Sequence, residues 1–392
     1  MGNSFSGGAA IVGLGISEVG KVYGKSVSEF AADAVLAAVA DAGLELADVD
    51  GVIMSYGVVS TSTTVADTLG LKDLSLSVTM ATAGATASVA VQYASMAVQC
   101  GHSSTVVYVH ADCPLQQPGA SAGAAYAGRG TPPMGFSAID MALGLFGGNP
   151  PYALMARRHM EKYGTTSEQL GAIAVAERQW AMMNPVAQMR TPMTIADHQA
   201  SRWICEPFHL LDCCPVSNGA VAVVITTSER AAHLPRPPAY VLGWGQCHPG
   251  YSNFRGSLEG LQSGATRSGE QAFAMAGITR DDIGVREFYD CYTFTVLLTL
   301  EDYGFVPKGE GGPFAASGEL APGGSMPTNT GGGQLSGFYL WGATPLHEAV
   351  IQCRGEGGER QVDDHDFVLV SGSGGSRMDH HATLILGANP RT

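Results

Sequence analysis

The chain has 392 residues, 45% of them hydrophobic and 14% charged, so it is long enough for a sizeable core and for two or three domains. Its formal net charge of −14 argues against nucleic acid or an anionic membrane surface as the main partner. We expect no membrane span and no signal peptide. The eight cysteines include no Cys-x-x-Cys pair, so we expect no metal held by this chain. Together these features predict a cytoplasmic protein with reduced thiols.

Two stretches far apart in the chain share one pattern. Ala9–Gly20 (AAIVGLGISEVG) and Ala239–Gly250 (AYVLGWGQCHPG) are both typical of apolar strands that end in glycines. Each is followed by a helical pattern and a matching phrase, Asp41–Met54 in the first case and Met275–Phe288 in the second. The repeat predicts two duplicated halves rather than a solenoid of short units. Its matched residues are Gly43 with Gly277 and Asp48 with Asp282.

Within each half, apolar strands alternate with Ala-rich helical patterns, which predicts an α/β layered fold. In the first half we expect a tightly buried helix at Ala85–Gln99 and a core strand at Thr105–His110. The Gly/Pro/Ala-rich segment Asp112–Pro151 is long enough to predict functional cover or an oligomer contact. The predicted units are an N-terminal half at 1–230, with a cover region at about 112–205, and a C-terminal half at 231–392.

A family resemblance is densest in Pro151–Pro185 and Asp197–Thr226, which contain the phrases YGTT and LDCCPVS. On these phrases the chain resembles the thiolase superfamily, specifically its sterol-carrier-protein or lipid-transfer branch, and the likeness runs nearly end to end. Asn218 departs from the family, which usually has Asp there. The resemblance implies a thiolase fold of two duplicated βαβαβαββ-type halves in a layered α-β-α-β-α arrangement. It also implies a homodimer whose interface lies near Val78–Ala90.

The nucleophile of a thiolase is absent from this chain. In the family a cysteine precedes a buried helix, whose N-terminus lowers the thiol pKa. The corresponding stretch is VTMATAGATAS (Val78–Ser88), and alignment on Gly84 places Ala81 at the cysteine position. Alanine cannot form an acyl-enzyme, and Thr82 without a neighbouring base is a poor substitute.

The family histidine and the second cysteine are absent as well. The family phrase Gly-His-Pro-x-Gly-Ala-Thr corresponds to GFYLWGAT, which is one residue longer. Alignment on Gly337 puts Phe338 at the histidine position, whereas alignment on Gly342-Ala343-Thr344 puts Tyr339 there, so the polar candidate is Tyr339. The final family turn, Cys-x-Gly-Gly-Gly, corresponds to SGSGG and places Ser371 at the second cysteine.

A tyrosine also stands at the oxyanion position. The family motif is His-Asp-Cys-Phe in the sterol-carrier branch, and here the phrase is EFYDCYTF (Glu287–Phe294). Tyr289 takes the place of the histidine, Asp290 and Cys291 match the branch, and Tyr292 replaces Phe. Four catalytic positions have changed while the scaffold phrases remain, which indicates a rebuilt site.

Two tyrosines suit a reaction without a covalent intermediate. Retro-aldol cleavage of a β-hydroxyacyl-CoA needs a base for the hydroxyl proton, donors for an enolate oxygen and a proton for carbon. A phenol can donate such hydrogen bonds, but its free pKa of about 10 means that as a base it needs a neighbour or a short relay. We predict that Tyr289 and Tyr339 are catalytic, with the division of base and acid roles open. The residues predicted to bind substrate are Tyr292, Phe338, Trp341 and Asp290.

The missing cysteine makes the chain similar to the steroid side-chain-cleaving aldolases of bacterial sterol catabolism. That resemblance implies cleavage of a 17-hydroxy steroid C20-carboxyl-CoA to a 17-ketosteroid and propionyl-CoA. It further implies a zinc-ribbon/OB-fold partner and a homodimer core within an α2β2 complex. No cofactor is expected besides the CoA of the substrate and zinc in the partner, and the residues that bind the CoA nucleotide stay unknown.

Two other hypotheses remain open from the sequence. The chain could be a non-catalytic thiolase-like scaffold that positions a partner. It could also be an acyl-CoA acyltransferase with a displaced nucleophile, for which Cys291 is the candidate. The Asp379-His380-His381 triplet is a weak metal candidate, because adjacent histidines on a strand point to opposite faces.

Overall fold

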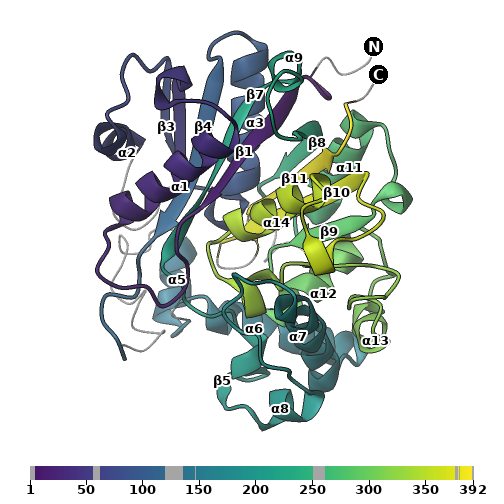
Figure 1. Ribbon diagram of the computed structural model, residues 1–392. Coiled ribbons are helices and arrows are strands. Elements are labelled where there is room, and N and C mark those ends of the chain that lie inside the picture. Colours follow the sequence, from purple (N-terminus) through teal and green to yellow (C-terminus); the bar gives the residue numbers. More distant parts are fainter. Residues whose placement is uncertain are drawn as a thin grey trace.

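The computed structural model describes residues 5–55, 62–119, 136–145, 147–249, 261–375, 378 and 380–390. Within these residues the main sheet has nine strands, in the order β3-β2-β4-β7-β1-β8-β11-β10-β9 (Figure 1). The strands are β1 (Ala9–Ile16), β2 (Gly51–Ser55), β3 (Leu76–Met80), β4 (Thr105–Asp112), β7 (Gly219–Thr227), β8 (Ala239–Cys247), β9 (Val285–Phe288), β10 (Phe367–Gly374) and β11 (His380–Gly387). A separate two-stranded sheet pairs β5 (Trp203–Cys205) with β6 (Phe208–His209).

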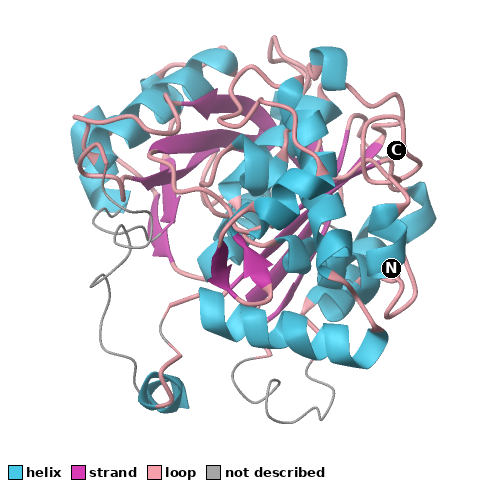
Figure 2. Cartoon of the chain, turned by 90° about the horizontal axis from the view of Figure 1, so that it is seen from below, coloured by secondary structure: helices cyan, strands magenta, loops and turns pink. Residues whose placement is uncertain are grey.

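Helices surround the strands of the sheet in the view from below (Figure 2). The α-helices are α1 (Val27–Asp41), α2 (Ser62–Leu69), α3 (Thr86–Gln99), α5 (Phe136–Ala142), α6 (Asn149–Tyr163), α7 (Ser167–Met182), α8 (Ile195–Ala200), α9 (Ser228–Ala231), α11 (Ala265–Ala276), α12 (Thr293–Asp302), α13 (Gly311–Ala316) and α14 (Ala343–Cys353). None of the described helices is long and apolar enough to span a membrane. The described residues also contain no cluster of metal-ligating side chains.

The predicted duplication is confirmed in the topology. In the first half, β2 lies between β3 and β4, and β7 and β1 follow; in the second half, β10, β11 and β8 follow β9 in the corresponding positions. The counterpart of β3 is reduced to an isolated parallel bridge between Arg286 and Thr328. The two halves of the sheet are joined at the start of β1, where Ala10 pairs with Tyr240 and Ile11 with Ala239.

Glycines bring a helix close to the sheet at the same place in both halves. A Cβ on Gly13 would lie 2.1 Å from the carbonyl oxygen of Ala38 in α1, and a Cβ on Gly243 would lie 2.3 Å from that of Ala272 in α11. Only glycine fits at such a distance. Both helices then end at a left-handed glycine, Gly43 and Gly277 with φ of 70° and 59°. The repeated sequence thus specifies a repeated strand-to-helix contact.

The helices form layers on the two sides of the sheet. One apolar cluster joins the sheet to α1 and α11, and a second joins the other face of the strands to α3 and α14. Since α3 and α14 pack against strands of both halves, they form the central layer of the predicted α-β-α-β-α arrangement. The segment between β4 and β7 contributes α6, α7 and α8, and α7 packs on α12 and α13 of the second half (Figure 1). Residues 120–135 and 146 of this segment lie outside the described residues.

Candidate active site

The turn that lacks the cysteine forms the floor of the site. Ala81 is exposed at the end of β3, and the 3₁₀ turn Ala83–Ala85 leads into α3. Gly84 is buried, and a Cβ there would lie 2.2 Å from Cε2 of Tyr289 and 1.9 Å from the carbonyl oxygen of Ser373. The ring of Tyr289 therefore rests directly on the backbone of Gly84, three residues beyond the position of the missing thiol.

The other two loops meet the same glycine. A Cβ on Gly342 would lie 2.1 Å from the carbonyl oxygen of Gly84, and a Cβ on Gly374 would lie 2.2 Å from its backbone nitrogen. The four segments that the sequence analysis compared with catalytic motifs thus converge at Gly84, although they come from β3, β9, β10 and the loop before α14.

The hydroxyl oxygens of Tyr289 and Tyr339 lie 3.1 Å apart, within hydrogen-bond distance. Tyr289 follows β9, and its backbone N–H donates to the carbonyl oxygen of Ser371 at 2.9 Å. Tyr339 follows the π-helical turn Gly333–Gly337, and its backbone N–H donates to Oγ of Ser217 at 2.8 Å. The two residues predicted to be catalytic are therefore brought together by two different loops, each anchored through its backbone.

Burial keeps Tyr289 protonated. Its side chain is only 5% exposed, and removal from water raises its pKa well above the ordinary value of 10. The nearby Cys291 and Tyr152 raise the pKa further, and the hydrogen bond with Tyr339 opposes them. At neutral pH Tyr289 is a neutral hydrogen-bond donor and cannot act alone as a free phenolate base.

Cys291 does not have the environment of a nucleophile. The thiol is buried, and desolvation followed by the nearby Asp290 raises its pKa above the ordinary range. A nucleophilic cysteine needs the opposite, a lowered pKa that supplies thiolate. Burial likewise raises the pKa of the adjacent-pair thiols Cys213 and Cys214, and all three cysteines are free.

Tyr292 is held between the cover region and the second half. Its hydroxyl donates to Oδ1 of Asn149 at 2.5 Å, and its ring stacks on Phe208 with centroids 5.0 Å apart. Tyr152 of α6 lies 4.8 Å from the same ring, centroid to centroid. A role for Tyr292 in substrate binding stays a prediction, since its polar and aromatic contacts are already made within the protein.

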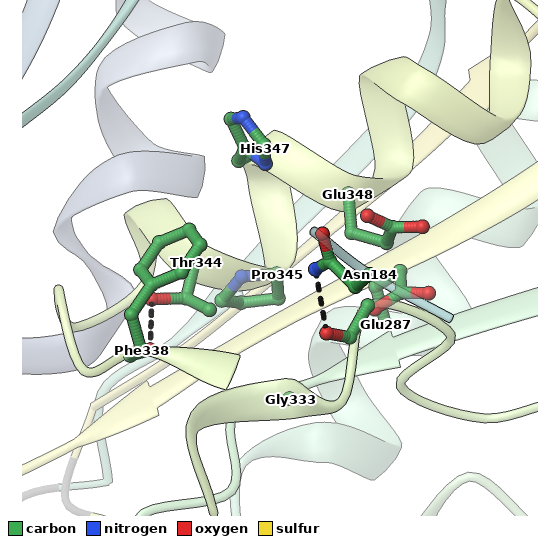
Figure 3. A pocket seen from close by; sticks show the side chains of 9 residues that line it. Asn184, Glu287, Gly333, Phe338, Thr344, Pro345, His347 and Glu348 are labelled. Carbon is green, nitrogen blue, oxygen red and sulfur yellow. Dashed lines mark hydrogen bonds between the residues drawn. The ribbon is translucent and has the colours of Figure 1, made fainter. Parts of the chain in front are cut away.

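Phe338 and Tyr339 lie on opposite sides of their loop, because the backbone at Phe338 is extended. Phe338 is 2% exposed and packs edge-on against His347 at 5.6 Å between centroids. It lines a small cavity together with His347, Glu348 and Glu287 (Figure 3). Its contact with substrate stays a prediction.

Trp341 is half-buried beside the site. Its φ of 51° is in the left-handed region, which is rare for a bulky residue, and its ring centroid lies 5.7 Å from that of His110. Such strain is found at ligand-binding loops. The prediction that Trp341 shapes the substrate pocket therefore stands as a proposal.

The contacts of Asp290, which was predicted to bind substrate, are made within the protein, and its substrate contact stays a prediction. Its carboxylate is fully buried, and Oδ2 accepts hydrogen bonds from the backbone N–H groups of Gln334 and Leu335 at 2.7 and 3.0 Å. Because it is the residue next to Tyr289, it connects the β9 loop with the loop that carries Tyr339. Its position is that of a support behind the site.

The hydroxyl of Ser371 makes its hydrogen bond with His381 rather than with Tyr289 or Tyr339. The Ser371 hydroxyl bonds to Nε2 of His381 at 3.0 Å, and Nδ1 of His381 bonds to Ser268 of α11 at 2.8 Å. The next residue, Gly372, faces the Gly84 turn, as expected for alternation along a strand. Burial lowers the pKa of His381 to about 3, so this chain of hydrogen bonds is neutral.

Sequence reasoning missed Glu177, which lies in α7 and is 2% exposed. It interacts with Asp290, and its Oε1 accepts a hydrogen bond from Asn329 at 2.8 Å. The signal was present in the sequence: Leu170, Ala174 and Ala181 follow the buried face of this helix, and Glu177 falls on the same face. A carboxylate within the apolar stripe of a helix is a candidate site residue.

The fold and the four loops that converge on Gly84 define a thiolase-like protein whose site contains two tyrosines and no cysteine nucleophile. A family described as "Thiolase C-terminal domain-like" matches residues 253–388. A "Steroid side-chain-cleaving aldolase" from Thermomonospora curvata is 39% identical over 98% of both chains. The "17-hydroxy-3-oxo-4-pregnene-20-carboxyl-CoA lyase" of Mycobacterium tuberculosis is 37% identical over 94% of this chain and 97% of the relative.

A solved structure of an "Ltp2-ChsH2(DUF35) aldolase" covers all of both chains with a TM-score of 0.88 and 37% identity. The chain belongs to the thiolase superfamily, within the family of the steroid side-chain-cleaving aldolases.

Proposed function

We propose that this chain is the catalytic subunit of a carbon–carbon lyase that performs retro-aldol cleavage of a β-hydroxyacyl-CoA. The substrate is a 17-hydroxy steroid C20-carboxyl-CoA, and the products are a 17-ketosteroid and propionyl-CoA. The substrate assignment is supported by the names of two relatives that span nearly the whole chain. The observation that carries the chemistry is the 3.1 Å contact between the hydroxyls of Tyr289 and Tyr339, above a turn with alanine in place of the thiol.

The two tyrosines act as one proton relay. A buried phenolate is unfavourable here, because burial raises the pKa of Tyr289. A concerted transfer avoids it: the proton of the substrate hydroxyl moves to one phenol oxygen, that phenol passes its own proton to the second, and the second protonates the α-carbon. The hydroxyl carbon becomes a ketone, and the electrons of the broken Cα–Cβ bond form the new C–H bond of propionyl-CoA. Both tyrosines end neutral.

Because the second phenol protonates the α-carbon as the Cα–Cβ bond breaks, the concerted transfer does not require a free enolate. Which tyrosine faces the substrate hydroxyl stays open, since either hydroxyl can be the donor in the hydrogen bond between them. The acyltransferase alternative needs a thiolate at Cys291, which its burial disfavours. The scaffold alternative is an outcome of the experiment below.

We further propose that the chain works within a larger complex. The solved relative is named as an aldolase together with a DUF35 component. For this chain we propose a partner with a zinc ribbon and an OB-fold, joined to a homodimer core as α2β2. In the strand order of the described residues β3 lies at one end of the sheet, and we propose that the two-fold axis of the homodimer lies near Val78–Ala90. A cytoplasmic location in a bacterium remains a prediction.

The test is turnover of 17-hydroxy-steroid C20-carboxyl-CoA by the complex, by the chain alone, and by complexes with Tyr289→Phe or Tyr339→Phe. We expect release of ketosteroid and propionyl-CoA by the wild-type complex and a loss of roughly 10²–10⁴-fold in each variant, the range for a lost proton-transfer group. Tyr240→Phe, a buried tyrosine of β8, is the matched control and should retain activity. Turnover that is indifferent to both site variants would favour the scaffold.

A further inference from the structure

Asp290 ties together the two loops that carry the tyrosines. It follows Tyr289 directly in sequence, and its Oδ2 binds the N–H groups of Gln334 and Leu335 in the turn that leads to Tyr339. Nε2 of Gln334 then donates to the carbonyl oxygen of Trp341 at 2.8 Å. A shift of this carboxylate would therefore change the separation of the two hydroxyls.

A second carboxyl faces the first. Glu177 extends from α7 toward Asp290. Two buried oxygens, Oε2 of Glu177 and Oδ1 of Asp290, accept no hydrogen bond from any group of the described residues. A Cβ on Gly333 would lie 2.3 Å from Oδ2 of Asp290 and 2.7 Å from Oε2 of Glu177, so the glycine leaves room for both carboxyls at one point. The two oxygens without a hydrogen bond, called orphan oxygens below, belong to side chains that are within hydrogen-bonding reach of each other.

Two ionised carboxylates in this position would repel each other without water to screen them. Glu287 lies near both, and burial and the nearby Glu348 raise its pKa well above the ordinary value, which is a further sign that negative charge is unfavourable in this region. One proton between the two orphan oxygens removes the repulsion and gives each of them a partner, as expected for buried polar groups.

We propose that Glu177 and Asp290 share one proton, carried on Oε2 of Glu177 and donated to Oδ1 of Asp290, and that this acid pair positions the Tyr289–Tyr339 relay. The proposal rests on the proposed function of the two tyrosines. Glu177 and Asp290 are positioning residues: their carboxyls support the loops and touch no reacting atom.

The partners on each side determine which carboxyl is neutral. Asp290 accepts two backbone N–H groups, which favour its charged form, whereas Glu177 accepts a single amide N–H from Asn329. Burial and the charge of Asp290 accordingly raise the pKa of Glu177 well above its ordinary value. Burial raises the pKa of Asp290 less, to about 6, because hydrogen bonds from Glu177 and the two N–H groups oppose it.

The arrangement makes a specific prediction for amide substitutions. In Glu177→Gln the amide N–H takes the place of the carboxylic O–H, and its oxygen still accepts from Asn329, so kcat should stay within roughly threefold of wild type. Glu177→Leu removes the donor and leaves Asp290 unpaired, and should lower kcat about 10-fold or more with KM nearly unchanged, since loop displacement misplaces the relay. Glu168→Gln, in the exposed first turn of the same helix, is the matched control.

The double variant tests proton sharing itself. In Asp290→Asn alone, the new amide can donate to an ionised Glu177, and a moderate loss is expected. In Glu177→Gln with Asp290→Asn, the amide oxygens are needed by the neighbouring donors, Asn329 on one side and the N–H groups of Gln334 and Leu335 on the other. The two NH₂ groups then face each other, and turning either amide sets its NH₂ group against those donors instead. The loss should therefore exceed the product of the single losses, a coupling expected for residues in contact or in one hydrogen-bond network. Additive losses, or a Gln variant as inactive as the Leu variant, would overturn the proposal.

A spectroscopic measurement separates this proposal from the proposed function. The infrared difference spectrum of wild type minus Glu177→Gln at neutral pH should contain the carbonyl stretch of a protonated carboxylic acid, and the same difference should appear in a Tyr289→Phe background. If steroid-CoA is not cleaved but the band is present, the acid pair stands and the substrate assignment fails. If cleavage is normal and the band is absent, the shared proton is refuted.

Discussion

The helices that follow β2 and β9 occupy equivalent places in the two halves but very different surroundings. α2 exposes Thr63, Thr64, Asp67 and Thr68 on the surface of the first half. All ten residues of α12 are buried, because α7 and α13 pack against it. The cover over the second half is supplied largely by the first half, through the segment between β4 and β7. The duplicated frame is thus symmetric, and the segments that enclose the site are not.

The contributions of the two halves to the site are equally uneven. The N-termini of α3 and α14 meet where Gly342 contacts the backbone of Gly84. At this junction the first half places the backbone of Gly84 beneath the ring of Tyr289, and the thiol position is Ala81. The second half contributes both tyrosines. In the proposed mechanism the chemistry lies in the loops of the second half, and the turn of the first half, which lacks the cysteine, supports the ring of Tyr289.

Among the variants that test this comparison of the two halves, the largest effect is expected from a side chain added at Gly84. In Gly84→Ala the new methyl group would overlap the ring of Tyr289 and the carbonyl oxygen of Ser373. We expect turnover to fall by about 10²-fold or more, since small displacements of catalytic groups have such effects, together with a loss of about 1–3 kcal/mol of stability from overpacking. Activity and urea unfolding of the complex measure the two effects. Ala81→Ser, at an exposed position of the same segment, is the control, and full activity of Gly84→Ala would contradict the contact.

The symmetric part of the molecule gives the next prediction. Gly13→Ala and Gly243→Ala each insert a methyl group against a helix carbonyl oxygen, at 2.1 and 2.3 Å. Each should lower the free energy of unfolding by about 1–3 kcal/mol, with similar values in the two halves. Denaturant titration of the two variants makes the comparison directly. A large loss in one half and none in the other would show that the repeated contact does not have the same energetic role.

The sequence was sufficient for the frame because its signals are local. Gly43 and Gly277 end their helices in the left-handed conformation, and the glycine-containing strands before them approach those helices closely. The same reasoning identified Tyr289 and Tyr339, because each stands in a phrase whose neighbours match the family. The structure adds that the two hydroxyls meet, which no single phrase contains.

The remaining site residues could not be placed from sequence, because their orientation depends on contacts between distant segments. Phe338 and Tyr339 are adjacent, and only the extended backbone decides which of them faces Tyr289. Asp290 matches a family motif, yet its carboxylate binds a turn more than forty residues away in the chain and a glutamate from the cover region. Motif position identifies such a residue as important without revealing whether it contacts substrate or supports the loop.

The smallest effect is expected at the border between the cover region and the second half. Tyr292→Phe removes one hydrogen bond to Asn149 of α6 and keeps the stacking on Phe208. The expected loss is about 1 kcal/mol of stability, with kcat and KM for steroid-CoA within a few-fold of wild type, measured by thermal unfolding and steady-state turnover. Asn149→Ala should lower stability to a similar extent, because it breaks the same bond from the other side. A large rise in KM for Tyr292→Phe alone would instead place the hydroxyl in contact with substrate and show that the second half's asymmetric cover also takes part in recognition.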